Sequence, residues 1–173
     1  MQKNLSRVAM WGALFLALGS AGASPARSAE GRETSLEQDR LAIENVAQDY
    51  VRALDGADLA AYLATLTDDA KFLSKEGNYF GKQAIADYVR PVLESRLAQM
   101  RDGTQANKGT HHVVTNVAIS FQGEDQAIMR SYWMFAVARK TGGIELSLMG
   151  SAEDHFVKRN GRWLISERHV ETL

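Results

Sequence analysis

The chain has 173 residues, with 20 basic and 21 acidic side chains, four histidines and no cysteine. That length fits one domain of ordinary size, and a hydrophobic share of 45% with a charged share of 24% is typical of a globular protein with a packed core. A formal net charge of −1 supplies no basic surface for neutralising phosphates, which argues against nucleic acid as a partner. The absence of cysteine excludes disulfides, thiolate nucleophiles and cysteine-based zinc sites, so any chemistry must rest on His, Asp, Glu, Tyr and Ser.

The first residues have the pattern of an export signal. Lys3 and Arg7 precede an uncharged, largely apolar run over 8–23, and the small residues Ala21 and Ala23 suit a signal peptidase. The strongly apolar part is shorter than the about 20 residues that span a bilayer, so we expect no stable membrane anchor after cleavage. The pattern predicts a signal peptide over 1–23, a flexible linker over 24–34, a domain over 35–173, and a periplasmic or secreted protein.

Much of residues 35–101 has apolar side chains at the spacing of helices. Apolar residues recur at helical intervals from Leu36 to Leu54, Ser35 can cap this helix and Gly56 can end it. Asp58 is a plausible cap for a second, short helix. A short strand is expected over 70–74, followed by a third helix over 82–100, which Pro91 should kink or split.

After residue 103 the apolar period drops to two, which predicts four long strands over 110–121, 126–140, 143–159 and 162–169. The segments between them are hairpin sequences, including Asn160-Gly161. Four successive strands should form an antiparallel meander. The expected fold is therefore α+β, with three N-terminal helices packed on one face of a mainly antiparallel sheet.

Six short sequence segments, in this order along the chain, resemble SnoaL-like domains of the nuclear transport factor 2-like superfamily. They lie at 39–55, 66–72, 81–85, 110–116, 130–133 and 153–163. The resemblance implies a cone-shaped fold, in which a curved sheet wraps around the helices and encloses a mostly apolar pocket for a small apolar molecule. The fold hosts dehydratases, isomerases, cyclases, hydrolases and non-catalytic binding modules, so it does not by itself assign an activity.

Two adjacent histidines compete for the pocket. Strict alternation along 111–121 places His111 on the more apolar face, which should point inward. The resemblance favours His112, because the histidine of dehydratase-like members aligns with it, four residues before Asn116. A bulge near the start of the strand would reconcile the two, and we take His112 as the catalytic candidate with His111 as a residue beside the substrate.

Asp55 and Tyr50 are the partners that the resemblance implies. In dehydratase-like members, an acid five residues after a tyrosine hydrogen-bonds the strand histidine. A carboxylate on one imidazole nitrogen fixes the tautomer, so the other nitrogen can move a proton. Tyr50 lies on the apolar stripe of the first helix, where its hydroxyl could donate to an oxyanion. The alternatives are that Asp55 and Asp58 only end one helix and start the next, and that Tyr50 is a packed aromatic.

Four further residues are candidates for orienting a substrate: Asn116, Tyr132, Arg130 and Asp154. Asp154 is the one charge on an otherwise apolar strand face, which requires an ion pair with Arg130 or Arg168, or a functional role. We expect no metal, because the adjacent histidines point to opposite faces and no carboxylate–histidine cluster has ligand spacing. No glycine-rich nucleotide loop is present either, so no cofactor is expected.

Two functions remain open at this point. One is a cofactor-free lyase or isomerase acting on a small apolar hydroxy-carbonyl compound. The other is a non-catalytic module that binds a small ligand or a protein. The apolar run Trp133-Met134-Phe135, which presents apolar residues on both strand faces, also favours a homodimer through the outer face of the sheet.

The export signal predicts a defined product. Cleavage after Ala23 would leave 150 residues with a formal charge of −3, because Lys3 and Arg7 are removed and no acid is lost. Intact-mass spectrometry of protein recovered from the periplasm or medium should show that chain. A full-length mass in a soluble extract would contradict the assignment.

Overall fold

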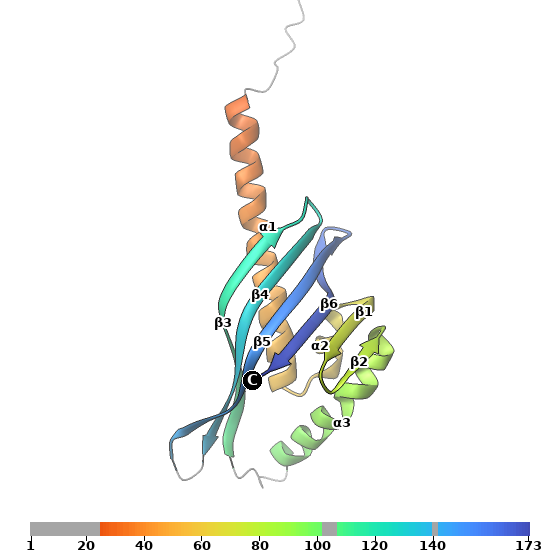
Figure 1. The fold of residues 1–173 in the computed structure, drawn as a ribbon, viewed down its shortest axis with the longest axis vertical. Helices are drawn as coiled ribbons and strands as arrows, with labels where there is room; N and C mark the ends of the chain where they lie inside the picture. The colour runs from red at the N-terminus through yellow and green to blue at the C-terminus, as the bar shows by residue number, and fades with distance from the viewer. Residues whose placement is uncertain (1–24, 102–106, 140–141) are drawn as a thin grey trace, which may run out of the picture.

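The chain folds into one six-stranded sheet with helices on its inner face (Figure 1). The computed structural model describes residues 25–101, 107–139 and 142–173, so the predicted export signal lies outside the described part. Within these ranges no helix is long and apolar enough to cross a membrane. The elements are α1 (Pro25–Asp55), α2 (Leu59–Ala64), β1 (Leu66–Ser74), β2 (Gly77–Phe80), α3 (Lys82–Arg101), β3 (Asn107–Phe121), β4 (Gln126–Arg139), β5 (Ile144–Arg159) and β6 (Arg162–Thr172).

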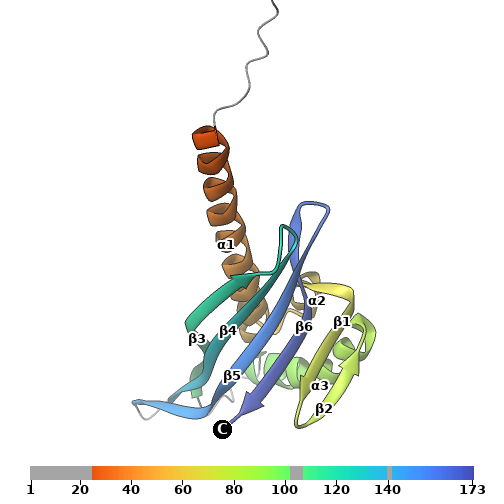
Figure 2. The ribbon, with the colours of Figure 1, turned by 45° about the horizontal axis from the view of Figure 1, so that its top comes forward.

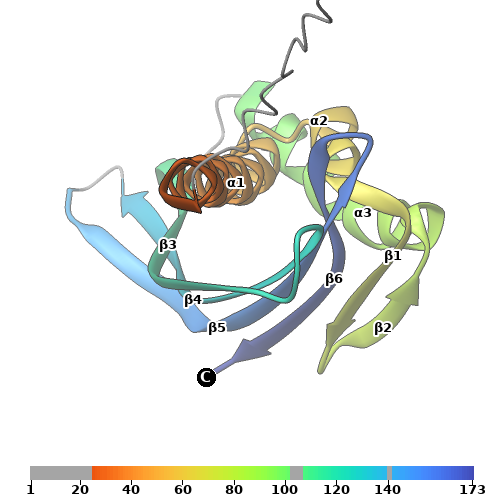
Figure 3. The ribbon, with the colours of Figure 1, turned by 90° about the horizontal axis from the view of Figure 1, so that it is seen from above.

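Strands β3 to β6 form the expected antiparallel meander. The sheet order is β2-β1-β6-β5-β4-β3, in which β6 also pairs with β1 in parallel. Asn160 and Gly161 have φ angles of 53° and 76°, as a two-residue hairpin turn requires, and they join Arg159 to its partner Arg162. Figure 3 shows the sheet curving around α1. The α+β class with a mainly antiparallel curved sheet is confirmed.

Helix α1 is longer than predicted. It begins at Pro25 rather than Ser35, so the segment expected to be a linker is helical from that residue, and the first part of the helix projects beyond the sheet (Figure 1). The helix becomes buried at Ile43, Tyr50 and Val51, which face the core. Asp39 marks the point of attachment, because its carboxylate accepts hydrogen bonds from Lys158 Nζ at 2.6 Å and Trp163 Nε1 at 2.9 Å.

The β1–β2 hairpin forms one edge of the sheet, and helix α3 packs against it (Figure 2). The helix continues through Pro91, so the expected split does not occur. β1 begins at Leu66, four residues before the predicted strand, and a second short strand, β2, follows it from Gly77. Tyr88 of α3 stacks on Tyr79 of β2, with ring centroids 4.0 Å apart, which fixes the helix on the hairpin.

A bulge in β3 decides which of its residues face inward. The register with β4 shifts between Thr115 and Ala118, where Asn116 adopts a left-handed φ of 54°. Before the bulge His112 faces inward, and after it Ile119 is buried in the core. The residues of β3 that face inward are thus even-numbered before the bulge and odd-numbered after it. Strict alternation was therefore wrong for the first half of the strand, because one extra residue reverses the faces.

Gly150 of β5 allows a close approach between neighbouring strands. A Cβ at this position would overlap the carbonyl oxygen of Glu171 and meet Trp133 Cε2 at 2.9 Å. Gly150→Ala should lower the free energy of unfolding by about 1–3 kcal/mol, as overpacking does, measured by urea denaturation. The neighbouring substitution Ser151→Ala, at a half-buried site, is the control and should cost much less. Equal free energies of unfolding for the two variants would contradict the close approach of Gly150 to Glu171 and Trp133.

Candidate active site

An apolar cavity of about 370 Å³ lies between the helices and the inner face of the sheet. Its walls are mainly aliphatic and aromatic, with a few charged groups among them. The residues that line it are Tyr50, Val51, Leu54, Phe72, Ser74, Glu76, Tyr88, Val92, Leu93, Arg96, His112, Val114, Trp133, Phe135, Leu148, Arg168, Val170 and Thr172. The volume falls within the range of small-molecule sites.

The end of α1 and the first half of β3 meet through Asp55 and His112. Asp55 Oδ1 lies 2.7 Å from His112 Nδ1, and Asp55 Oδ2 accepts the backbone N–H of the same histidine at 3.0 Å. Both side chains are largely buried, at 15% and 23% exposure. Asp58, by contrast, caps α2 by accepting the Ala61 N–H at 2.9 Å. The turn chemistry expected for these acids therefore applies to Asp58, whereas Asp55 reaches the strand histidine.

The ionisation of Asp55 fixes the tautomer of His112. Burial alone would raise the pKa of Asp55, but the hydrogen bonds from His112 and the charge of Arg96 outweigh it and hold the pKa below its usual value. A carboxylate only accepts, so Nδ1 must carry the proton that joins the two groups. Nε2 is then unprotonated when the ring is neutral. Because the pKa is lowered, this contact stabilises the fold above the ordinary carboxyl pKa and is lost as the pH falls through the lowered value.

Arg96 of α3 also contacts the point where the end of α1 meets β3. Its guanidinium donates to Asp55 Oδ1 and to the Leu54 carbonyl, each at 3.4 Å, and to the Thr110 carbonyl at 2.6 Å. It also hydrogen-bonds the Thr110 hydroxyl. One cation therefore ties the end of α1 to the start of the inward-facing part of β3, and it lines the cavity as it does so.

A second ion pair lies deeper, between β5 and β6. Asp154 is fully buried, and both of its oxygens accept from Arg168 Nη1 at 2.7 Å. Burial raises the pKa of Asp154, and the arginine opposes that rise. Burial alone would lower the pKa of Arg168, but Asp154 and the neighbouring tyrosines outweigh it and raise the pKa further, so the guanidinium stays charged. The ion pair expected for Asp154 is present, with Arg168 as partner, and it places a cation in the cavity wall.

Tyr50 connects this cation to the helices. Arg168 Cζ lies 4.5 Å from the centre of the Tyr50 ring, and the Tyr50 hydroxyl lies 3.2 Å from that of Tyr62. Burial raises the pKa of both phenols, so both stay protonated. One of them donates to the other. If Tyr62 is the donor, the Tyr50 proton remains free to point into the cavity that Tyr50 lines.

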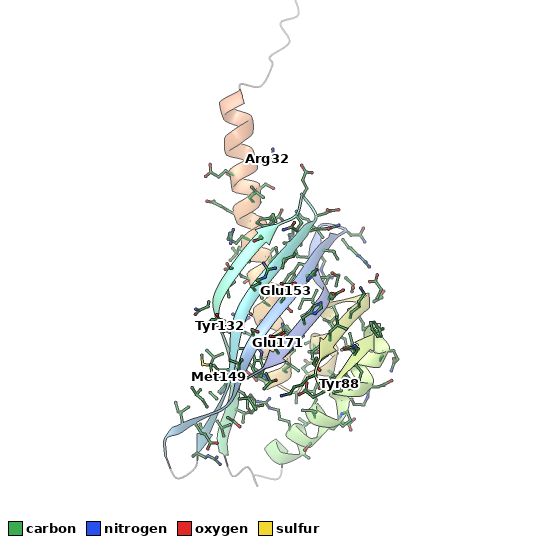
Figure 4. All side chains as sticks on the ribbon, in the orientation of Figure 1. Arg32, Tyr88, Tyr132, Met149, Glu153 and Glu171 are labelled. Carbon is green, nitrogen blue, oxygen red and sulfur yellow. The ribbon has the colours of Figure 1, made fainter. Side chains whose placement is uncertain are left out.

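The remaining predicted residues lie on the outer face of the sheet or point to solvent. His111 is 74% exposed, and its ring is 3.7 Å from Asp55 at the edge of the site. A separate hollow on the outer face of the sheet is lined by Asn116, Tyr132 and Arg130. Arg130 forms an ion pair with Glu153 at 2.7 Å. Figure 4 shows Tyr132 and Glu153 on this face. The structure thus brings Tyr50 and His112 together at the cavity wall, with Asp55 paired to His112 and Asp154 paired to Arg168. Asn116, Tyr132 and Arg130 lie apart from them, on the outer face of the sheet.

Sequence reasoning did not select Arg96 as a site residue, and it named Arg168 only as a partner for Asp154. A signal for Arg96 was present, because it continues the apolar stripe of α3 through Val89, Val92 and Leu93. A charge on such a stripe needs a buried partner. Arg168 carries no comparable signal apart from Asp154, because only the strand register places the two opposite each other.

The comparisons with known proteins agree with this fold. The model of the SnoaL-like domain matches residues 36–169. No curated protein matches the chain. Among solved structures, an NTF2-like protein with a cystatin-like fold from Novosphingobium aromaticivorans is 18% identical, covers 87% of this chain and 91% of its own, and has a TM-score of 0.69.

Two neighbours carry names of enzymes. A scytalone dehydratase candidate from Novosphingobium aromaticivorans is 23% identical over 82% of this chain and 88% of its own, with a TM-score of 0.63. The hexachlorocyclohexane dehydrochlorinase LinA-type3 from Novosphingobium barchaimii is 17% identical over 81% and 90%, with a TM-score of 0.64. At these identities the likeness establishes the fold alone.

The buried ion pair predicts an unequal effect of two similar substitutions. Asp154→Asn leaves Arg168 charged and unpaired in the interior, so it should cost about 3–5 kcal/mol of unfolding free energy. Asp69→Asn breaks an exposed pair with Arg159 and should cost less than about 1 kcal/mol. Urea denaturation measures both. If Asp154→Asn is as mild as Asp69→Asn, the guanidinium is not desolvated as described.

Proposed function

Because the chain belongs to the SnoaL-like domain family, we propose that it is a cofactor-free lyase or isomerase acting on a small apolar hydroxy-carbonyl compound. The observation that carries this proposal is the Asp55–His112 contact, at 2.7 Å, on the wall of an apolar cavity. A histidine whose one nitrogen is fixed by a carboxylate is suited to move a proton at the other.

The first step uses Nε2 of His112 as a base. It removes a proton from the carbon next to the substrate carbonyl, and the electron pair of that C–H bond forms an enolate. The ring then carries two protons, and Asp55 stabilises the resulting imidazolium through Nδ1. General base catalysis of this kind contributes roughly 10²–10⁴-fold to a rate.

The cation in the wall suits the charge that develops. Arg168 is held by Asp154 and by the Tyr50 ring, so it is positioned before substrate binds. An enolate oxygen near this guanidinium, or near the Tyr50 hydroxyl, would be stabilised more than the neutral carbonyl.

The second step distinguishes the two reaction types. In a lyase reaction the enolate electrons form a C=C bond, the C–O bond at the next carbon breaks, and His112 returns its proton to the departing hydroxyl, which leaves as water. In an isomerase reaction His112 returns the proton to a different carbon. The names of the two enzyme-like neighbours, a dehydratase and a dehydrochlorinase, both describe eliminations and favour the lyase reaction.

The proposal predicts a graded loss of turnover. Hydroxy-carbonyl compounds, with chlorinated analogues as a second set, would be incubated with the protein and followed by mass spectrometry for loss of water or hydrogen chloride. His112→Ala should reduce turnover by about 10²–10⁴-fold, because the base is removed. Asp55→Asn should also reduce it, because the neutral amide no longer stabilises the imidazolium.

Two matched variants make the test specific. Asp49→Asn changes an exposed acid of the same helix, paired only with Arg52 in the described structure, and should retain wild-type turnover. His111→Ala decides between the neighbouring histidines and should cost far less than His112→Ala. Ligand binding without turnover, with an affinity unchanged by His112→Ala, would instead identify a non-catalytic binding module.

A further inference from the structure

The outer face of the sheet carries a second group of histidines, away from the inner cavity. His155, Glu167 and His169 each offer a ligand atom, and these three atoms all lie within 4.8 Å of one another. We propose that they form a binding site for a divalent transition-metal ion, represented by Zn²⁺.

The backbone pairing places these side chains together. His155 on β5 lies opposite Glu167 on β6, and Glu153 lies opposite His169. Residues two apart in a strand share a face, so the four form a square of alternating histidine and glutamate. Their inward-facing neighbours, Asp154 and Arg168, belong to the buried ion pair, which confirms that this square points outward.

The glutamates are held in place from both sides. Glu167 Oε1 lies 2.5 Å from His169 Nε2 while its Oε2 accepts from Lys71 at 2.8 Å. Glu153 repeats this arrangement with His155 at 2.9 Å and Arg130 at 2.7 Å. Contacts to both oxygens orient each carboxylate, as outer partners orient metal ligands elsewhere. An ion would take the place of the proton between His169 and Glu167.

The donor set selects the class of ion. Two imidazoles and one carboxylate suit Zn²⁺ and its transition-metal neighbours, whereas Mg²⁺ and Ca²⁺ prefer oxygen ligands throughout. Ligands of a tetrahedral Zn²⁺ lie about 3.4 Å apart, given bonds of about 2.0–2.1 Å. Rotation of exposed side chains can close the present spacing, because His155 and His169 are 36% and 44% exposed.

Three protein ligands leave one position of a tetrahedral ion open. His169 also lines the outer hollow, of about 570 Å³, whose other walls include Arg130, Tyr132 and Glu171 (Figure 4 labels Tyr132 and Glu171). The open position therefore has room for water or a small ligand. Spacing along the chain did not reveal this cluster, because strand pairing brings its residues together.

The test is calorimetric titration of untagged protein with ZnCl₂. Wild type should bind one ion per chain, and His155→Ala and His169→Ala should each weaken binding by about tenfold or more. His111→Ala removes an exposed histidine outside the cluster and should bind as wild type does. Circular dichroism checks that each variant is folded, which is expected because both cluster histidines are at the surface.

Cobalt supplies a second readout. Co²⁺ at this site should show the visible absorption of a nitrogen- and oxygen-ligated ion, and His155→Ala with His169→Ala in one chain should abolish that absorption. No binding above the heat of dilution would overturn the proposal, as would binding that the double variant leaves unchanged. Because the site is on the opposite face from His112, either result leaves the proposed turnover to be judged by its own variants.

Discussion

The carboxylate of Asp55 holds three elements at one point, and the inner cavity depends on that junction. It accepts both the ring nitrogen and the backbone N–H of His112, and Arg96 of α3 donates to it. The end of α1, the first half of β3 and the C-terminal part of α3 are therefore fixed relative to one another without a disulfide, which a chain with no cysteine cannot form. A histidine oriented by two contacts to one carboxylate has little freedom to leave the cavity wall, so its ring keeps a fixed orientation there.

The same cavity combines charged groups with apolar walls because each buried charge has a partner. Asp154 neutralises Arg168, and Asp55 faces Arg96 and His112. An unpaired charge in this position would be too costly to keep, whereas a paired one remains available to interact with a ligand. The apolar remainder of the wall lowers the local dielectric, which strengthens electrostatic interactions in the cavity.

Much of this arrangement was predictable from local pattern. The helical spacing up to Leu54, the strand alternation after residue 103 and the Asn160-Gly161 turn predicted the α+β meander, because each depends on residues close in the chain. The face of β3 was not predictable in this way. The bulge at Asn116 depends on pairing with β4, and the one hint in the sequence is that asparagine tolerates a left-handed conformation. The start of α1 at Pro25 was missed because the polar segment has no apolar stripe, although a proline at the first helical position is a common start signal.

The sequence by itself determined the fold class, the order of the elements, and the limitation of chemistry to histidine, carboxylate and tyrosine side chains. It also identified Asp55 and His112 as a pair through resemblance to a family. Only the tertiary structure decided which histidine enters the cavity, which arginine neutralises Asp154, and that Asn116, Tyr132 and Arg130 share the opposite face with two further histidines. The reason is physical: residue type and spacing set local structure, whereas register and bulges arise from pairing between strands far apart in the chain.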